Sequence, residues 1–419
     1  MSVPLSLPNP LPWLDRPLVV RVLAAFADDD KPVRFVGGAV RDTLLGLFTK
    51  KMDLDLCTPA TPGEVTALLQ KASITVKPTG IAFGTVMAVA DGDHLEITTL
   101  RRDIDTDGRH ATVSFGQSWE EDARRRDFTI NALYADPDGT LHDTVGGLAD
   151  LQNGIVRFIG DPLARVREDY LRILRYFRFY ARFGTGEADP EALGACAALK
   201  AHIADLSRER VWMELSKLLM LDVPHKAARA MQLCGVLDAL LPGEPGEEKL
   251  EADIDRLEAY AEIESHNDFA PVPVLRLAAL FPDADDVLPS RLKLSTREAD
   301  WLELTAETLA APDPAALARV WYRHQDTIGR ARAWLPNLAF LYSVVVETVD
   351  ADTAVTFAAA WEAPVFPLAG ADMIGLGVES GPRMGEILAA VESWWIDENF
   401  APTRAACLDR ARAVVHNAA

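Results

Sequence analysis

Two carboxylates stand two residues apart in the segment MDLDLCT, as Asp53 and Asp55. In a β-strand, side chains two positions apart point to the same side, so the pattern predicts that both acids converge on one spot. Bare carboxylates would repel each other there, whereas a divalent cation between them would remove the repulsion. Magnesium prefers such hard oxygen ligands and commonly joins carboxylates to substrate phosphates. Glu96, in the strand-like run HLEITTLR, is a candidate third acid, and a solvent-facing polar edge is the structural alternative.

A glycine pair lies upstream of these acids. Gly37 and Gly38 follow the apolar run RFV and precede the helix-like segment AVRDTLLG. Backbone N–H groups at such a strand-to-helix turn can hold a phosphate, and Arg41, one turn later, could neutralise it. The pair lacks the GxGxxG spacing of a dinucleotide fold and the GK[ST] ending of a P-loop. A turn with a purely geometric role is therefore the alternative.

Two further blocks carry polar groups at regular spacing. In RRRDFTINAL, hydrogen-bonding groups stand at Arg126, Asp127 and Asn131, although a solvated basic edge would give the same pattern. In EDYLRILRYFRF, Asp169 and Arg172 are three residues apart, which predicts neighbours on one face of a helix. Arg175 and Arg178 follow at the same interval. Intrahelical ion pairing on a wet face is the alternative for that block.

The elements that must position these residues fall into two regions. From residue 33 to about residue 159, strand-like runs such as RFVGG, GTVMAVA, HLEITTL, FTINALYAD and IVRFIG alternate with helix-like ones such as TPGEVTALLQKA. Beyond Pro162, apolar residues recur at three- and four-residue spacing, as in RERVWMELSKLLM, which predicts helices throughout. The sequence therefore predicts one α+β domain followed by a long all-helical region.

Composition narrows the class of protein. The 419 residues carry a net charge of −21 and are about half hydrophobic, which is typical of a soluble globular protein. No apolar run reaches the roughly 18 residues that a membrane span needs. The four cysteines form no CxxC pair, which argues against a structural zinc site and favours reduced thiols in a cytoplasm. Seven arginines against three acids between Arg157 and Arg182 allow a local basic surface.

Taken together, these blocks resemble the class II tRNA nucleotidyltransferases, which are the CCA-adding enzymes and their bacterial poly(A) polymerase relatives. Five segments carry the resemblance in the family's order, and GADMIGLGVESGPRMGEIL resembles the family's C-terminal segment. The five are GGAVRD with DLD within residues 37–55, RRDFTINAL at 125–133, DTVGGLADL at 143–151, EDYLRILRYFRF at 168–179 and SRERVWMEL at 207–215. Departures are small: Leu54 and Leu56 flank the acids, and Met373 stands where the family often has leucine.

The resemblance implies an α+β chain with a polymerase-β-like nucleotidyltransferase head and an all-helical neck, body and tail. Its expected parts are a lead-in at 1–31, the catalytic head at 32–160, a neck with nucleotide-selecting and RNA-binding helices at 161–242, a body at 243–363 and a tRNA-contacting tail at 364–419. It implies catalytic roles for Asp53, Asp55 and Glu96, with Mg²⁺ on Asp53 and Asp55. The residues expected to bind the nucleotide are Gly37, Gly38, Arg41, Arg126, Asp127, Asn131, Asp169, Arg172, Arg175 and Arg178.

The implied activity is the template-independent addition of CMP and AMP, from CTP and ATP, to the 3′ end of tRNA in the cytoplasm. The expected partners are the tRNA acceptor end and the two nucleotides, with no membrane. A poly(A) polymerase of the same family is one alternative. The stretch RRDIDTDGRHATVSFG resembles the flexible loop of full CCA-adding enzymes, and the basic extension of the bacterial poly(A) polymerases is not evident. A non-catalytic RNA-binding protein on this fold is a second alternative, against which the intact Asp53 and Asp55 argue.

Overall fold

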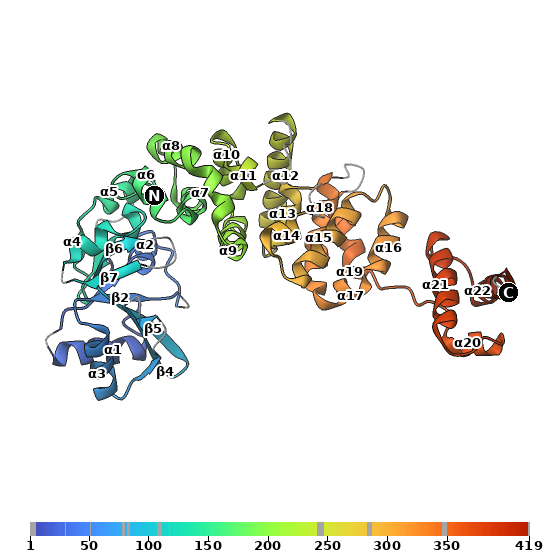
Figure 1. The fold of residues 1–419 in the computed structure, drawn as a ribbon, viewed down its shortest axis with the longest axis horizontal. Coiled ribbons are helices and arrows are strands. Elements are labelled where there is room, and N and C mark those ends of the chain that lie inside the picture. Colours follow the sequence, from blue (N-terminus) through green and yellow to red (C-terminus); the bar gives the residue numbers. More distant parts are fainter. Residues whose placement is uncertain are drawn as a thin grey trace. The chain divides into compact units, whose positions relative to one another are not determined.

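The computed structural model describes residues 6–29, 31–50, 52–77, 80–81, 84–106, 111–116, 118–240, 247–282, 287–345 and 350–417. The chain divides into two compact units, Met1–Glu244 and Pro245–Ala419. In the part that is described, every strand lies before residue 144, and the chain beyond it is helical (Figure 1). The α+β fold class expected from the sequence is confirmed.

The first unit is built on a mixed sheet with the strand order β3-β4-β5-β2-β1-β8-β9. Its strands are β1 (Arg34–Val36), β2 (Asp55–Thr58), β3 (Thr75–Lys77), β4 (Thr85–Ala90), β5 (Asp93–Thr99), β8 (Leu133–Ala135) and β9 (Leu141–Asp143). β2 and β5 run parallel, whereas the other neighbouring strands pair antiparallel. The glycine turn after β1 and the acids at the start of β2 therefore lie at the same end of adjacent strands.

Side chains along β5 alternate between the two faces of the sheet, and this alternation places Glu96. Leu95 and Ile97 are fully buried, so Glu96 between them points to the opposite face of the sheet. Asp55 of β2 is the register partner of Glu96. The hydrophobic pattern of two short strands thus places two acids side by side.

A separate hairpin follows β5. It consists of β6 (Arg101–Thr106) and β7 (Ala111–Phe115). These strands cover most of the expected flexible loop at 101–116, of which residues 107–110 lie outside the described part of the chain.

Helices cover the sheet and extend beyond it within the first unit. Its α-helices are α1 (Pro17–Asp28), α2 (Gly38–Leu44), α3 (Pro62–Lys71), α4 (Trp119–Arg124), α5 (Gly147–Gln152), α6 (Pro162–Glu168), α7 (Leu171–Phe183), α8 (Pro190–Leu199), α9 (Arg208–Leu219), α10 (Pro224–Leu233) and α11 (Val236–Leu240). Short 3₁₀ segments are η2 (Thr129–Asn131) and η3 (Lys200–Asp205). The helix expected from TPGEVTALLQKA is α3, and a capping box between Thr61 and Glu64 fixes its start.

Two expected strands differ in the structure. FTINALYAD begins as η2 and becomes a strand only at β8, and IVRFIG contributes a single bridge between Phe128 and Phe158. A second glycine turn, at Gly146 and Gly147, lies against η2, where the first difference occurs. A Cβ on Gly147 would lie 2.1 Å from the carbonyl oxygen of Thr129, so the backbones approach closely there. Asp143 caps this turn by accepting hydrogen bonds from four backbone N–H groups.

The second unit is helical in its described residues. It contains α12 (Glu247–His266), α13 (Pro273–Leu280), α14 (Leu288–Leu292), α15 (Thr296–Leu309), α16 (Pro314–Arg323), α17 (Gln325–Arg330), η4 (Arg332–Trp334), α18 (Leu335–Val345), α19 (Ala351–Ala360), α20 (Gly370–Gly375), α21 (Pro382–Asp397) and α22 (Arg404–Asn417). A buried ion pair between Glu264 and Arg276 joins α12 to α13, with Nε 2.7 Å from Oε2. Asn337 of α18 donates to the same carboxylate at 2.8 Å, so three helices share one polar contact.

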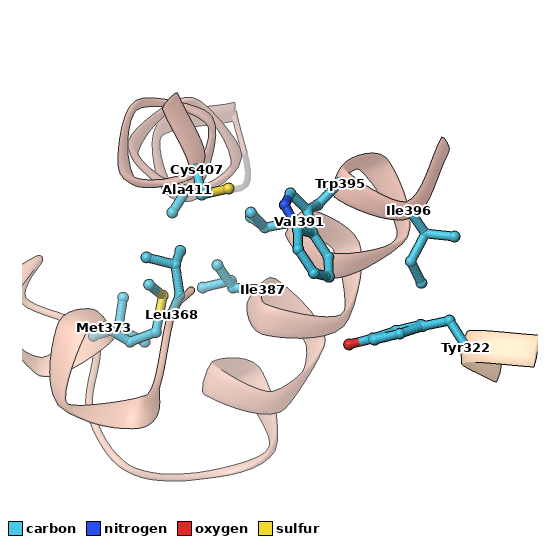
Figure 2. Packing of buried hydrophobic residues seen from close by; sticks show 10 residues of the cluster. Tyr322, Leu368, Met373, Ile387, Val391, Trp395, Ile396, Cys407 and Ala411 are labelled. Atoms are coloured by element: carbon cyan, nitrogen blue, oxygen red, sulfur yellow. The ribbon is translucent and has the colours of Figure 1, made fainter. Parts of the chain in front are cut away.

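The last helices of this unit have a hydrophobic core of their own (Figure 2). Its buried members are Tyr322, Leu368, Met373, Val378, Ile387, Val391, Trp395, Ile396, Cys407 and Ala411. All of them follow residue 367 except Tyr322, which comes from α16. The hydroxyl of Tyr322 also donates to Glu392 at 2.6 Å. We call this group, within residues 368–411 together with Tyr322, the tail core.

The sequence-based domain bounds remain predictions. The division between residues 244 and 245 falls near the expected boundary at 242/243, and the finer divisions at 160/161 and 363/364 stay expectations. Within the described ranges, no helix has both the length and the apolar character needed to cross a membrane.

Candidate active site

The acid pair lies where β2 begins, and only one member belongs to the strand. β2 starts at Asp55, whereas Asp53 precedes it with a side chain that is 85 % exposed. The expectation that both acids alternate within one strand is therefore wrong for Asp53. The reason is that β1 pairs with β2 only from Val36 opposite Asp55, and the chain then leaves the sheet at Gly37. Nε2 of His94 lies 3.5 Å from Oδ1 of Asp53.

Asp55 and Glu96 form an exposed edge of negative charge. Burial raises the pKa of the Asp55 carboxyl, Glu96 and Asp53 raise it further, and Arg126 opposes them. Both neighbouring carboxylates therefore act on Asp55. In the described residues, neither Asp55 nor Glu96 has a hydrogen-bond or ion-pair partner.

This acid edge fits a hard cation without being a closed cage. Within the described ranges, no group of three or more His, Cys, Asp or Glu side chains is arranged to enclose a metal ion. Asp55 and Glu96 nevertheless offer oxygens that have no competing partner among the described residues, and a cation would relieve their repulsion. Mg²⁺ usually takes only one or two carboxylates and completes its shell with water and substrate phosphates. The donor set thus matches a cation that arrives with a phosphorylated substrate.

The glycine turn brings two arginines near its backbone. Gly37 has φ of +70°, a conformation that favours glycine. A Cβ on Gly37 would lie 3.5 Å from the carbonyl oxygen of Asn131 and 3.7 Å from Nη1 of Arg126. The N–H of Gly37 already donates to Leu133 at 3.0 Å, so it does not face an incoming anion as expected. Any phosphate contact from this turn falls to Gly38 and the residues after it.

Arg41 is a buried and fully engaged residue. It is 5 % exposed, and its Nη2 lies 2.6 Å from Oδ1 of Asp42, while Nη1 donates to Asn131. Its guanidinium stacks on Phe183, 4.1 Å from the ring centroid. Burial lowers the pKa of Arg41, and the ion pair with Asp42 counteracts this. Arg41 thus helps to build the turn in this structure, and a direct phosphate contact would require these bonds to be shared.

Asp127 connects the arginine block to α7. Its Oδ2 accepts from Nε of Arg175 at 2.9 Å, and its Oδ1 accepts from Asn131 at 3.0 Å. Burial acts to raise the pKa of Asp127, but Arg175 and Asn131 outweigh burial and hold it below its usual value. Arg175 also lies 3.6 Å from Glu214, which accepts from Arg178 at 2.7 Å. Five of the residues predicted to bind nucleotide, Arg41, Asn131, Asp127, Arg175 and Arg178, therefore belong to one polar network.

Asp169 and Arg172 are arranged differently from the expectation. α6 ends at Glu168, and Asp169 has extended backbone in the break before α7, so the two residues do not share a helix face. Oδ1 of Asp169 accepts from the backbone N–H of Leu171, and its Oδ2 accepts from Arg210 at 2.6 Å. Arg172 pairs with Glu168 at 2.6 Å. The extended residue arises because α7 starts anew and Asp169 caps it.

The basic surface expected between Arg157 and Arg182 is largely neutralised within the protein. Arg182, for instance, lies 3.1 Å from Asp42. Five further arginines form ion pairs: Arg157 with Asp150, Arg165 and Arg172 with Glu168, Arg175 with Asp127 and Glu214, and Arg178 with Glu214. Arg167 is exposed. Any contact with RNA phosphates in this region must compete with these acids.

Two acids that organise the site were not singled out from the sequence. Asp122 accepts from both Arg125 and Arg126, and its position three and four residues before them in WEEDARRRD is a helical ion-pair signal. Glu214 is 2 % exposed and stands on the apolar stripe of α9 with Val211 and Leu215. A glutamate on such a stripe indicates a buried cationic partner, although the sequence alone does not say which arginine it is.

Residues 33–157 match the family described as Poly A polymerase head domain, and residues 187–244 match Probable RNA and SrmB- binding site of polymerase A. The chain is 35% identical over 379 residues to the mitochondrial CCA tRNA nucleotidyltransferase 1 of Mus musculus, covering 88% of this chain and 84% of that protein. The chain belongs to the class II tRNA nucleotidyltransferase family. Members of this family generally use divalent metals.

Other members of the class II tRNA nucleotidyltransferase family extend the comparison. The CCA-adding enzyme of Levilactobacillus brevis is 32% identical over 367 residues, covering 85% of this chain and 88% of that enzyme. The crystal structure of the Bacillus stearothermophilus CCA-adding enzyme in complex with CTP superposes with a TM-score of 0.75 and 26% identity. The superposition covers 97% of this chain and 99% of the Bacillus stearothermophilus enzyme chain. The family resemblance inferred from the ordered blocks is confirmed.

Proposed function

We propose that this nucleotidyltransferase adds CMP and AMP, from CTP and ATP, to the 3′ end of tRNA. The observation that carries the proposal is its similarity, over most of both chains, to proteins named CCA tRNA nucleotidyltransferase and CCA-adding enzyme. The acid edge beside the glycine turn supports it, because phosphoryl transfer to RNA needs charge neutralisation at the nucleotide phosphates. The partners implied by the proposal are CTP, ATP and the tRNA acceptor end.

The chemistry would transfer a nucleotidyl group. The 3′ hydroxyl oxygen of the RNA attacks the α-phosphorus of the nucleotide, the bond between the α- and β-phosphates breaks, and pyrophosphate leaves with that electron pair. Asp53 and Asp55 would hold Mg²⁺, with Glu96 as the neighbouring acid, and the bound ion would neutralise phosphate charge and favour loss of the hydroxyl proton. Gly38 and Arg126 would orient the triphosphate beside this acid edge. The network of Arg41 and Asp127 would keep that geometry fixed.

Base selection is proposed to fall to Asp169 and Arg172. Cytosine and adenine each present an amine donor beside a ring nitrogen acceptor, which suits a carboxylate beside a guanidinium. Uracil and guanine present the reverse order on their Watson–Crick edges. Asp169 and Arg172 are paired with Arg210 and Glu168 in this structure, so these partners would have to yield or share their hydrogen bonds when a base is bound.

A primer-extension assay tests the function. A tRNA ending before its CCA sequence is incubated with Mg²⁺ and CTP, ATP or both, and the products are sized. We expect two added residues with CTP alone and three with both nucleotides. No incorporation under any condition would leave the non-catalytic RNA-binding alternative standing.

A poly(A) polymerase is the second candidate, because the family description that matches residues 33–157 names a Poly A polymerase head domain. The same assay separates the two functions. Long tails made from ATP alone, on tRNA or on unrelated RNA, would identify a poly(A) polymerase. Stopping after one terminal adenosine would support CCA addition.

The compartment proposed is the cytoplasm. The supporting observation is the presence of four free cysteines, of which Cys57, Cys196 and Cys407 are buried. The mouse relative is named as mitochondrial, so localisation of a tagged chain in its own cell is the direct measurement.

A further inference from the structure

One buried carboxylate holds two consecutive arginines of the arginine block. Oδ1 of Asp122 accepts from Nε and Nη2 of Arg125, at 2.9 and 2.6 Å. Oδ2 accepts from Nε and Nη2 of Arg126, at 3.2 and 3.1 Å. The hydroxyl of Tyr134 donates to the same Oδ2 at 2.7 Å, and Asp122 has no exposed surface. The carboxylate is thus saturated by groups that fix its orientation.

The same contacts leave one edge of the Arg126 guanidinium open. Nε also donates to the hydroxyl oxygen of Tyr134 at 3.1 Å, and Nη2 lies 3.3 Å from the sulfur of Cys57. Across the described residues, Nη1 makes no hydrogen bond. This nitrogen borders the space where a Gly37 side chain would stand, 3.7 Å from the position of a Cβ.

Arg126 and Asp122 are both charged at neutral pH. Burial acts to lower the pKa of Arg126, but its surroundings, Asp122 among them, raise it well above its usual value. Burial acts to raise the pKa of Asp122, and Arg126, Arg125 and Tyr134 outweigh it and lower that pKa. Arg126 is therefore a fixed cation whose Nη1, without a hydrogen bond among the described residues, borders the glycine turn.

We propose that Asp122 and Tyr134 are positioning residues that aim Nη1 of Arg126 at the glycine turn, where it holds the triphosphate of the incoming nucleotide. This inference rests on the proposed function, because that function places a nucleoside triphosphate there. In this arrangement Nη1 contacts the phosphates of the nucleotide and not its base. Loss of either positioning residue should therefore weaken the binding of CTP and the binding of ATP to the same extent.

The experiment separates phosphate binding from base reading and from folding. Asp122→Asn and Tyr134→Phe are compared with wild type for KM and kcat with CTP and with ATP, and for binding of inorganic tripolyphosphate with Mg²⁺. We expect Asp122→Asn to raise both KM values and the tripolyphosphate dissociation constant about 10-fold, and Tyr134→Phe to raise them less. The preference between CTP and ATP and the KM for tRNA should stay unchanged.

Glu120→Gln is the matched control, because Glu120 lies on the same helix α4 and pairs with Arg124 at the surface. It should leave all of these values as in wild type. Tyr134→Phe retains the buried ring, so it tests the proposal even where Asp122→Asn fails to fold. Unchanged KM and tripolyphosphate binding in folded Tyr134→Phe and Asp122→Asn would overturn the positioning role. A wild-type chain that binds neither tripolyphosphate nor nucleotide would instead overturn the proposed function.

Discussion

Asp127 accepts a hydrogen bond from Nε of Arg175 at 2.9 Å, across 48 residues of sequence. The contact joins the end of the arginine block to the helix α7. Asp127 also accepts a hydrogen bond from Asn131, and Asn131 accepts one from Arg41. The carboxylate of Asp127 therefore links the glycine turn with α7. Its removal should affect both parts at once.

Asp127→Asn should lower the free energy of unfolding by about 1.5–3 kcal/mol, the usual contribution of a hydrogen bond to a charged group. The pKa of Asp127 is lowered from its usual 3.8, because Arg175 and Asn131 outweigh burial. The stabilisation is therefore complete above pH 3.8 and is lost as the pH falls below it. Urea denaturation at several pH values measures this. A variant as stable as wild type at pH 7 would contradict the expectation.

Asp55→Asn should reduce nucleotide incorporation by more than about 100-fold, because it removes a proposed metal ligand. The same variant should be more stable than wild type at neutral pH with EDTA present. Burial, Glu96 and Asp53 raise the pKa of Asp55 above 3.8, so its ionised form opposes folding once the pH exceeds that value. Mg²⁺ titrations followed by thermal denaturation should stabilise wild type more than the variant.

Asp91→Asn serves as the control for that experiment. Asp91 is an exposed acid in the turn between β4 and β5, 3.8 Å from Arg21. It should change neither activity nor the response to Mg²⁺. Near-normal turnover of Asp55→Asn at saturating Mg²⁺ would show that Asp55 is not a ligand of the catalytic metal.

Arg172→Ala and Asp169→Ala should each reduce selectivity for CTP and ATP over UTP and GTP. A matched bidentate contact discriminates between bases by about 1–3 kcal/mol, which is roughly 10- to 200-fold. Competition assays with all four triphosphates measure the ratio directly. Arg167→Ala, at an exposed position in the last turn of α6, is the control. Unchanged selectivity in both test variants would show that Asp169 and Arg172 form structural ion pairs and do not select the base.

Cys57 should resist alkylation by iodoacetamide in the folded protein at pH 8. The side chain is buried, and burial raises the pKa of its thiol to about 12, so the reactive thiolate is scarce. Cys234, which is only half-buried, should react first. Above pH 9.0 the unfolded thiol loses a proton that the folded thiol keeps, so this group lowers stability as the pH rises toward 12. Peptide mass spectrometry after timed labelling checks the order of reaction.

Local patterns predicted much of the catalytic unit. The runs RFV, GTVMAVA and HLEITTL form β1, β4 and β5, because alternation of apolar side chains is a signal carried by neighbouring residues. Glu96 was a candidate third acid, but its register with Asp55 is known only from the folded sheet, in which β2 and β5 are parallel neighbours. Family resemblance supplied the roles, which composition and spacing alone left open.

The misplaced residues were those whose conformation depends on distant partners. Asp53 lies outside β2 because β1 ends at Val36, and Asp169 leaves the helix because it caps α7 and meets Arg210 of α9. Helical periodicity runs through EDYLRILRYFRF without a visible break, so the sequence gives no local sign of it. Pairings such as that of Glu214 with Arg178 are likewise set by packing between helices.

The tail core has a consequence for how the second unit opens. Its buried residues lie within residues 368–411 apart from Tyr322, so in the described part of the unit Tyr322 is the one buried member of this core from the helices before α20. Segments of this kind can unfold as one cooperative unit at a lower free energy than the whole protein. Backbone amides of these three helices should therefore exchange with deuterium at one common opening free energy, and Tyr322→Ala should lower that energy without changing protection in α12, α13 and α18.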